Sequence, residues 1–167
     1  MVFIIFNLFC FVRNGFLRFP YLKSREDAIK NLNHIYDLEN NYFKINNKYS
    51  AKFDEIKFIP KANNGGGRYV YFLGEDKRYA NSNFSESYHI KELPKYYSKM
   101  AYANQKSFQA LAVSDLDPTN NKLDILSVNE KGKIEIISND FIGAYIFTWD
   151  NCTLYLMKEK EIKYCIR

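Results

Sequence analysis

Apolar residues follow three different patterns along the chain. The first twelve residues, MVFIIFNLFCFV, are apolar except at Asn7. From residue 24 onward, apolar residues recur at intervals of three and four, which is typical of an amphipathic helix. After residue 68, short runs of β-branched and aromatic residues alternate with turn-forming residues, which is typical of strands. The order of these patterns predicts an apolar N-terminal segment, then a helix, then a sheet.

The apolar N-terminal segment is too short to cross a membrane as a helix by itself. Twelve helical residues span about 18 Å, whereas the hydrocarbon core is about 30 Å thick and needs about 20 apolar residues. No basic residue precedes the run and no small-residue cleavage site follows it, which disfavours a signal peptide. We interpret residues 1–22 as a shortened or degenerate anchor that continues the following helix, with a buried segment of a soluble protein as the alternative.

The predicted helix covers residues 24–45. Ser24 is its expected N-cap, and Asp27, three residues later, completes an arrangement similar to a capping box. The apolar stripe consists of Ala28, Ile29, Leu32, Ile35, Tyr36, Tyr42 and Phe43. The side chains expected to be buried against the sheet are Leu32, Ile35 and Phe43.

Four strands are predicted for the middle of the chain. They cover RYVYFLG at 68–74, SFQALAVSDL at 107–116, DILSVNE at 124–130 and KIEIIS at 133–138. Short strands joined by turns imply an antiparallel sheet. Residues 82–105 lack a clean period and are predicted to be irregular and partly helical, while AYIFTW and TLYLM in the C-terminal extension 141–167 predict a further hairpin. The expected fold class is α+β, with a long N-terminal helix packed on four or more antiparallel strands.

Composition limits the function classes. A chain of 167 residues is long enough for one core and too short for two full-sized domains. The net charge of +5 comes from basic residues interleaved with acidic ones, so no basic run indicates a nucleic-acid stripe. The sequence has no G-x-S-x-G, no H-E-x-x-H and no Cys–His pair. We therefore expect a protein that is not an enzyme and that needs no cofactor.

The loop between the second and third predicted strands carries three aspartates and two asparagines within residues 114–124. The side chains with the spacing of a calcium-binding loop are Asp115, Asp117, Asn121 and Asp124. Pro118 and Thr119 stand where such loops prefer glycine and aspartate, and both are common in turns. We favour a plain hairpin turn and keep a weak calcium site as the competing hypothesis.

Three stretches have an order and spacing characteristic of one protein family. FLRFPYLKSREDAIKNLNHIYDLENNYFKINNKYS resembles the family's helix exit and following motifs. The matching positions are Phe16, Phe19, Asp27, Ala28, Asn31, Leu32, Ile35, Tyr36, Tyr42, Phe43, Asn46 and Tyr49. RYVYFLG resembles the next strand of the family, and FQALAVSDLD resembles the strand and loop after it, with Ser114 where glycine is common. Over about residues 16–140 the chain is similar to the type IV pilins and pseudopilins.

This resemblance implies a structural subunit of a type IV pilus or of a related type II secretion pseudopilus. Residues 23–167 would form the head, and the N-terminal helix would bundle with that of other pilin subunits, placed by the inner-membrane assembly machinery. The chain would reside in the inner membrane before assembly and afterwards on the bacterial cell surface. The family's glycine processing site and N-terminal glutamate are not found in this sequence. We expect a divergent or truncated N-terminus, or a true start upstream of Met1.

Two alternatives to filament assembly remain open. The first is a DNA-binding head, for which lysines and arginines would have to cluster on one face; the candidates are Lys57, Lys61, Arg68, Lys77 and Arg78. The second is an extracellular adhesion module that binds calcium through the 114–124 loop. Cys152 and Cys165 are close enough in sequence to pair, and pilin heads are often stapled near the C-terminus, but both could equally be buried thiols.

Overall fold

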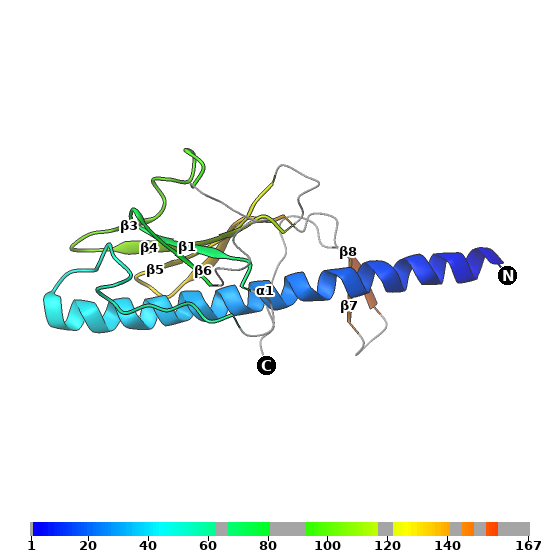
Figure 1. Cartoon of the computed structure of the whole chain (residues 1–167), viewed down its shortest axis with the longest axis horizontal. Helices are drawn as coiled ribbons and strands as arrows, with labels where there is room; N and C mark the ends of the chain where they lie inside the picture. The colour runs from blue at the N-terminus through cyan, green and yellow to red at the C-terminus, as the bar shows by residue number, and fades with distance from the viewer. Residues whose placement is uncertain are drawn as a thin grey trace. The chain divides into compact units, whose positions relative to one another are not determined.

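The computed structural model describes residues 2–62, 67–80, 93–116, 122–140, 145–148 and 153–156, with only the backbone described for 2–21, 145–148 and 153–156 (Figure 1). The chain divides into two compact units. One contains Met1–Phe19 and Phe141–Arg167, and the other contains Pro20–Asp140. The second unit contains the helix–sheet core.

Helix α1 spans Val2–Asn46, so the apolar N-terminal segment belongs to the same helix as the predicted amphipathic part. The prediction that Ser24 caps the helix was wrong, because Ser24 lies in the helix interior and is buried. A cap is needed only where backbone N–H groups lack a partner in the preceding turn, and the helix continues before Ser24. The C-terminal end follows the usual rule: Asn47 adopts a left-handed φ of 54° and donates its N–H to the Phe43 carbonyl at 2.8 Å.

The main sheet has six antiparallel strands in the order β2-β1-β4-β5-β6, with β3 paired to β4 beside β1. Its strands are β1 (Val70–Leu73), β2 (Asp76–Tyr79), β3 (Tyr102–Ala103), β4 (Phe108–Ser114), β5 (Asp124–Asn129) and β6 (Ile134–Ser138). The four predicted strands correspond to β1, β4, β5 and β6. The other two were missed because β2 is a polar edge strand, DKRY, and β3 contains only two residues.

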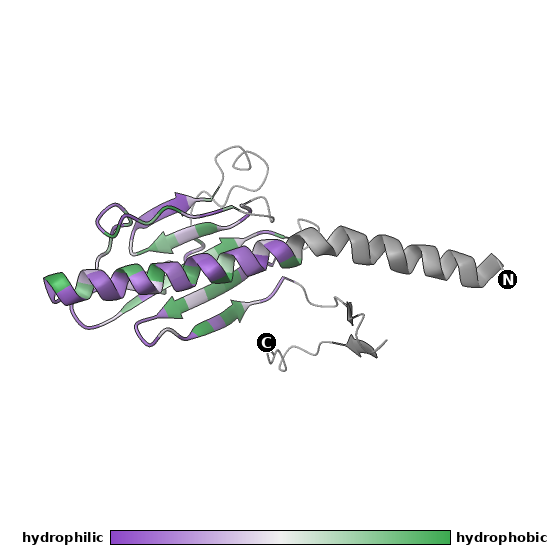
Figure 2. Cartoon of the chain, turned by 90° about the horizontal axis from the view of Figure 1, so that it is seen from below, coloured by the Kyte–Doolittle hydropathy of each residue, from purple (hydrophilic) through white to green (hydrophobic). Residues whose placement is uncertain are grey.

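The part of α1 from residue 22 to residue 46 packs on one face of this sheet, which confirms the α+β class. Ala28, Leu32 and Ile35 have no exposed surface. In β4, Ala110 and Ala112 are fully buried and lie opposite Val128 and Leu126 of β5. Figure 2 shows hydrophobic and hydrophilic residues alternating around this part of the helix, with hydrophobic residues concentrated in the neighbouring strands. The helix therefore buries one stripe, as the period of its sequence predicts.

Phe43 is less buried than predicted. Its side chain is only partly buried, and its ring stacks on Tyr49 with centroids 4.6 Å apart. Tyr49 in turn contacts Phe108 at the start of β4, with centroids 5.0 Å apart. Phe43 reaches the sheet through Tyr49 because the chain turns back under the last helical turn and places this ring between them.

The opposite face of the sheet is also covered. Its buried cluster consists of Val70, Phe72, Ala101, Leu111, Val113 and Ile125, and Tyr97 and Met100 pack against it. These last two side chains come from the predicted irregular region. Its described part, residues 93–105, consists of turns and β3 and contains no helix, which corrects the partly helical prediction for that part. Burial on both faces explains why β4 is apolar almost throughout.

In the other unit, β7 (Tyr145–Thr148) and β8 (Thr153–Leu156) form a separate two-stranded antiparallel sheet. This pairing confirms the predicted C-terminal hairpin. Its register pairs Tyr145 with Leu156 and Thr148 with Thr153.

Candidate functional site

A buried polar cluster joins α1 to the sheet at the start of β5. Arg25 donates from Nε to Asp124 Oδ2 at 3.0 Å, and its Nη2 contacts Asp124 Oδ1. The same Nη2 donates to Asn139 Oδ1 at 2.8 Å. The Tyr69 hydroxyl also donates to Asp124 Oδ2. We call Arg25, Asp124, Tyr69 and Asn139 the Arg25 cluster.

The ion pair at the centre of the Arg25 cluster is almost completely removed from water. The Arg25 side chain is 8% exposed and the Asp124 side chain is 0% exposed. Burial, and then the Asp124 charge, raise the pKa of Tyr69 well above its ordinary value, so this hydroxyl keeps its proton and acts as a donor. A buried ion pair is tolerated when its remaining hydrogen-bonding positions are filled, and the two-pronged guanidinium contact fills them here. This arrangement is suited to holding the helix in register on the sheet.

The predicted calcium ligands are placed as follows. Asp124 is the acceptor of the Arg25 cluster, and Asp115 is partly buried just after β4. Asp117 and Asn121 lie outside the described residues. Among the residues that the structure describes, no group of three or more His, Cys, Asp or Glu side chains could hold a metal ion. The calcium site stays a prediction, and Asp124 would have to exchange a guanidinium for the ion.

A second polar contact holds the segment that follows the helix. Asn31 donates from Nδ2 to the Lys61 carbonyl at 2.9 Å and accepts the Lys61 N–H on Oδ1 at 2.9 Å. It also donates to the Tyr71 hydroxyl at 2.8 Å. One amide side chain thus satisfies the main chain of residue 61 in both directions and connects it to β1, which ties the returning segment along α1.

A third cluster lies near the C-terminal end of α1. Glu39 is 0% exposed and accepts the Ser50 N–H on Oε2 at 2.9 Å. The Ser50 hydroxyl donates to Glu55 Oε2 at 2.8 Å, and the Tyr42 hydroxyl donates to the same oxygen at 2.9 Å. Burial raises the pKa of Glu39 to about 7, the Ser50 N–H opposes this shift, and the Glu55 charge adds to it. Ser50 therefore bridges two glutamate side chains, one buried and one exposed.

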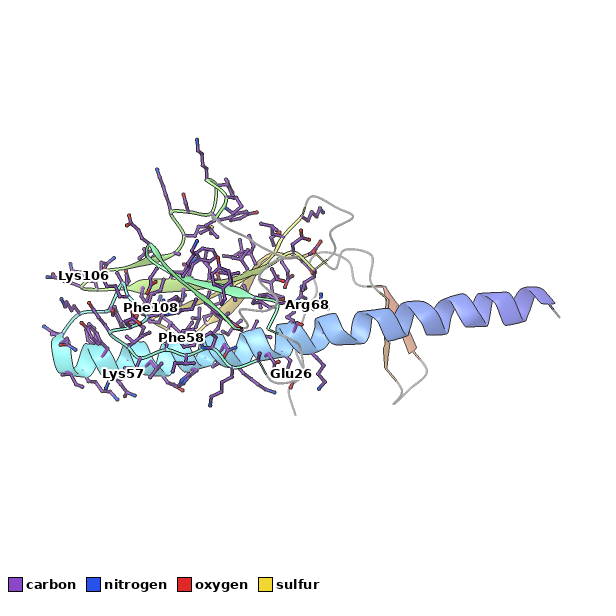
Figure 3. All side chains as sticks on the ribbon, in the orientation of Figure 1. Glu26, Lys57, Phe58, Arg68, Lys106 and Phe108 are labelled. Carbon is purple, nitrogen blue, oxygen red and sulfur yellow. The ribbon has the colours of Figure 1, made fainter. Side chains whose placement is uncertain are left out.

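The basic residues proposed for DNA contact do not share one setting. Arg78 pairs with Asp54 at 2.5 Å and with Asp76 at 3.6 Å. The Lys77 ammonium lies 6.0 Å from the centre of the Tyr79 ring. Figure 3 shows Lys57 and Arg68 in separate parts of the head. Acidic partners and this separation weaken the attraction that a phosphate backbone would feel at this set of residues.

The stretch Leu93–Ser114 combines exposed aromatic and basic side chains, and we call it the Tyr96 stretch. No acidic residue occurs from Leu93 to Ser114. Within this stretch Tyr96 is 81% exposed, and its ring meets Tyr97 edge to face with centroids 4.9 Å apart. The exposed lysines of the stretch are Lys95, Lys99 and Lys106. Tyr97 packs against the buried cluster of the sheet, so the exposed Tyr96 ring rests on a side chain that is anchored in the core.

Comparisons with family models, with curated proteins and with solved structures found no significant match to this chain. In the described part of the chain, no helix is both long enough and apolar enough to cross a membrane. Cys152 and Cys165 lie outside the described residues, so their predicted pairing is untested.

Sequence reasoning missed the partner of Asp124 and the burial of Glu39. Arg25 and Asp124 are separated by 99 residues, and no local pattern connects them. One signal was available for Glu39, because it lies four residues after Ile35 and seven after Leu32, on the side of the helix that carries the apolar stripe. A carboxylate at such a position is a candidate for burial.

Proposed function

We propose that this chain is a structural subunit of a type IV pilus-like or type II secretion pseudopilus-like filament. The proposal rests on the continuity of α1, which joins the apolar N-terminal segment to the half of the helix that packs on the sheet. An apolar helical segment is stable only where another apolar surface covers it. In a filament that surface is the same segment of neighbouring copies, and the sheet domain faces outward.

The order of elements supports the same assignment. One long helix comes first, and β1, β4, β5 and β6 follow as an antiparallel sheet packed on it. The motifs that resemble pilins lie in this helix and in β1 and β4. The expected partners are other pilin subunits along α1 and the inner-membrane assembly machinery, with the chain moving from the inner membrane to the cell surface.

Self-association of the full chain tests this proposal. Chemical cross-linking in cell membranes or mild detergent is expected to give a ladder of oligomers. Ile5→Lys should abolish the ladder, because a charge in a helix bundle would be buried without a partner. The matched control is Ile45→Lys, which places the same charge at an 84% exposed position of the same helix. A wild-type chain that stays monomeric, or an Ile5→Lys chain that forms the same ladder, contradicts the proposal.

A second candidate function is contact of the head with single-stranded DNA, and the exposed Tyr96 and the lysines of the Tyr96 stretch favour it. Exposed aromatic rings stack on bases, and lysines attract phosphates. The stretch from Leu93 to Ser114 contains no carboxylate that would repel a phosphate. Stacking of one base contributes roughly 1–3 kcal/mol, so Tyr96→Ala should weaken binding about 5- to 150-fold. Fluorescence anisotropy with a labelled oligonucleotide measures this, with Lys133→Ala as the control at a 67% exposed lysine elsewhere on the head. Equal affinities for wild type and Tyr96→Ala would exclude the Tyr96 stretch.

A further inference from the structure

Glu39 is a buried acid with one oxygen that makes no hydrogen bond. Its Oε2 accepts the Ser50 N–H at 2.9 Å, whereas its Oε1 is buried and has no hydrogen-bond partner. A buried carboxylate oxygen without a donor destabilises the ionised form, because water would otherwise solvate that charge. This geometry favours the protonated acid over the carboxylate.

The ionisable groups around Glu39 do not offset its charge. The groups that interact with Glu39 are Tyr42 on α1 and Tyr49 and Glu55 in the segment after the helix. Tyr36 on α1 and Glu130 in the β5–β6 turn act on Tyr49 together with Glu39. None of these side chains is a lysine, an arginine or a histidine. Lys48 and Lys52 act on the exposed Glu55 instead. A proton is thus the positive charge that this site can accept most readily.

Glu39 also lies at the point where the returning segment meets the helix. On its other sides the segment is held by two further bonds, from the Tyr49 N–H to the Asn104 carbonyl at 3.1 Å and from the Phe53 N–H to Asp76 Oδ2 at 2.8 Å. These bonds lead to the β3–β4 turn and to the β1–β2 hairpin. Glu39 supplies a side-chain bond from α1 to this segment, in addition to the Asn47 N–H bond to the Phe43 carbonyl and the stacking of Tyr49 on Phe43.

We propose that Glu39 is a proton-operated latch, which holds residues 47–54 against α1 when it is protonated and lets them open when it ionises. In the closed segment burial raises its pKa to about 7, and in the open segment water would return that pKa to its ordinary value of 4.5. The closed form therefore binds the proton more tightly. Its advantage is complete below pH 4.5, declines as pH rises, and is lost above pH 7. This behaviour does not depend on filament assembly.

The size of the effect follows from these two pKa values. One proton titrates, with a pKa of about 7 in the closed segment and 4.5 in the open segment. The ratio of open to closed segment therefore increases about tenfold between pH 6 and pH 8. From pH 5 to pH 8 the same expression gives an increase of about 70-fold. Both changes are large enough for a measurement of local opening.

Hydrogen exchange of the full chain tests the latch. After correction for intrinsic exchange chemistry, opening at Ser50 and Phe53 should increase about tenfold between pH 6 and pH 8. Glu39→Gln, which carries no ionisable proton, should remove this pH dependence. Glu26→Gln is the matched control, because Glu26 lies on the same helix, is exposed and has a lowered pKa; it should keep the wild-type behaviour. The proposal is overturned if opening at Ser50 and Phe53 does not change with pH in the wild type, or if it keeps its full pH dependence in Glu39→Gln.

A second measurement applies even if Glu39→Gln does not fold. The carboxyl carbon of Glu39 in the wild-type chain can be followed by NMR as pH is changed. The latch predicts a midpoint near 7, well separated from exposed glutamates. A midpoint near the ordinary glutamate value would mean that the site does not retain its proton and would contradict the latch.

Discussion

Removing the guanidinium from the Arg25 cluster should cost more stability than any exposed charge substitution on the same helix. Arg25→Met keeps a flexible apolar side chain but deletes the contacts to Asp124 and Asn139. Asp124 then stays fully buried with the Tyr69 hydroxyl as its remaining side-chain donor in the cluster. Loss of one partner of a buried pair typically costs about 3–5 kcal/mol, because the other charge is left uncompensated.

Urea unfolding followed by circular dichroism measures this loss, and a domain of ordinary stability should still fold with the substitution. Lys30→Met is the matched control. Lys30 pairs with Glu26 on the exposed side of α1, where the two side chains are 60% and 48% exposed, so its loss should cost less than about 1 kcal/mol.

The double substitution Arg25→Met with Asp124→Asn separates lost attraction from a stranded charge. Asparagine can still accept the Tyr69 hydroxyl but carries no charge, so the double variant should be more stable than Arg25→Met alone. The reasoning would be refuted by an Arg25→Met cost below about 1 kcal/mol, or by a double variant that loses the full sum of both single effects.

Three further outcomes are expected for the head. Leu32→Ala should lower the free energy of unfolding by about 2–5 kcal/mol in urea titrations, since this side chain has no exposed surface; a negligible change would argue against the helix–sheet core. Global stability should fall by about 3 kcal/mol as pH rises from 4.5 to 8, because the folded state holds the Glu39 proton up to a pKa of about 7; thermal melts of wild type and Glu39→Gln should diverge in this window. Calcium at 100 times a dissociation constant would add about 2.7 kcal/mol, and we expect no such rise in melting temperature. A rise that is lost in Asp117→Ala would instead establish the ion site.

The sequence was sufficient for elements whose burial leaves a regular pattern. The three- and four-residue spacing of Leu32 and Ile35 identified the helix stripe, and apolar β-formers identified β1, β4, β5 and β6. β2 was missed because an edge strand need not be apolar on either face. The helix start was misplaced because Ser24 matches a capping pattern that operates only where the preceding turn is missing.

The polar clusters depend on contacts that a local pattern cannot reveal. Asp124 was predicted as a calcium ligand, and in the structure its carboxylate pairs with Arg25, which lies 99 residues earlier in the sequence. Choosing between calcium and a guanidinium requires knowing which residue the fold brings beside the carboxylate. The same holds for Asn31, whose partners Lys61 and Tyr71 follow it by 30 and 40 residues.

The filament proposal can be tested most directly on cells that express the full chain. Surface filaments are removed by mechanical shear, separated from cells, and examined by immunogold electron microscopy with an antibody against the head. We predict gold labelling along the filaments, with labelling lost in Ile5→Lys and kept in Ile45→Lys. A chain that is abundant in the cells but absent from sheared filaments, with the same distribution in both variants, would contradict the proposal that α1 assembles it into a filament.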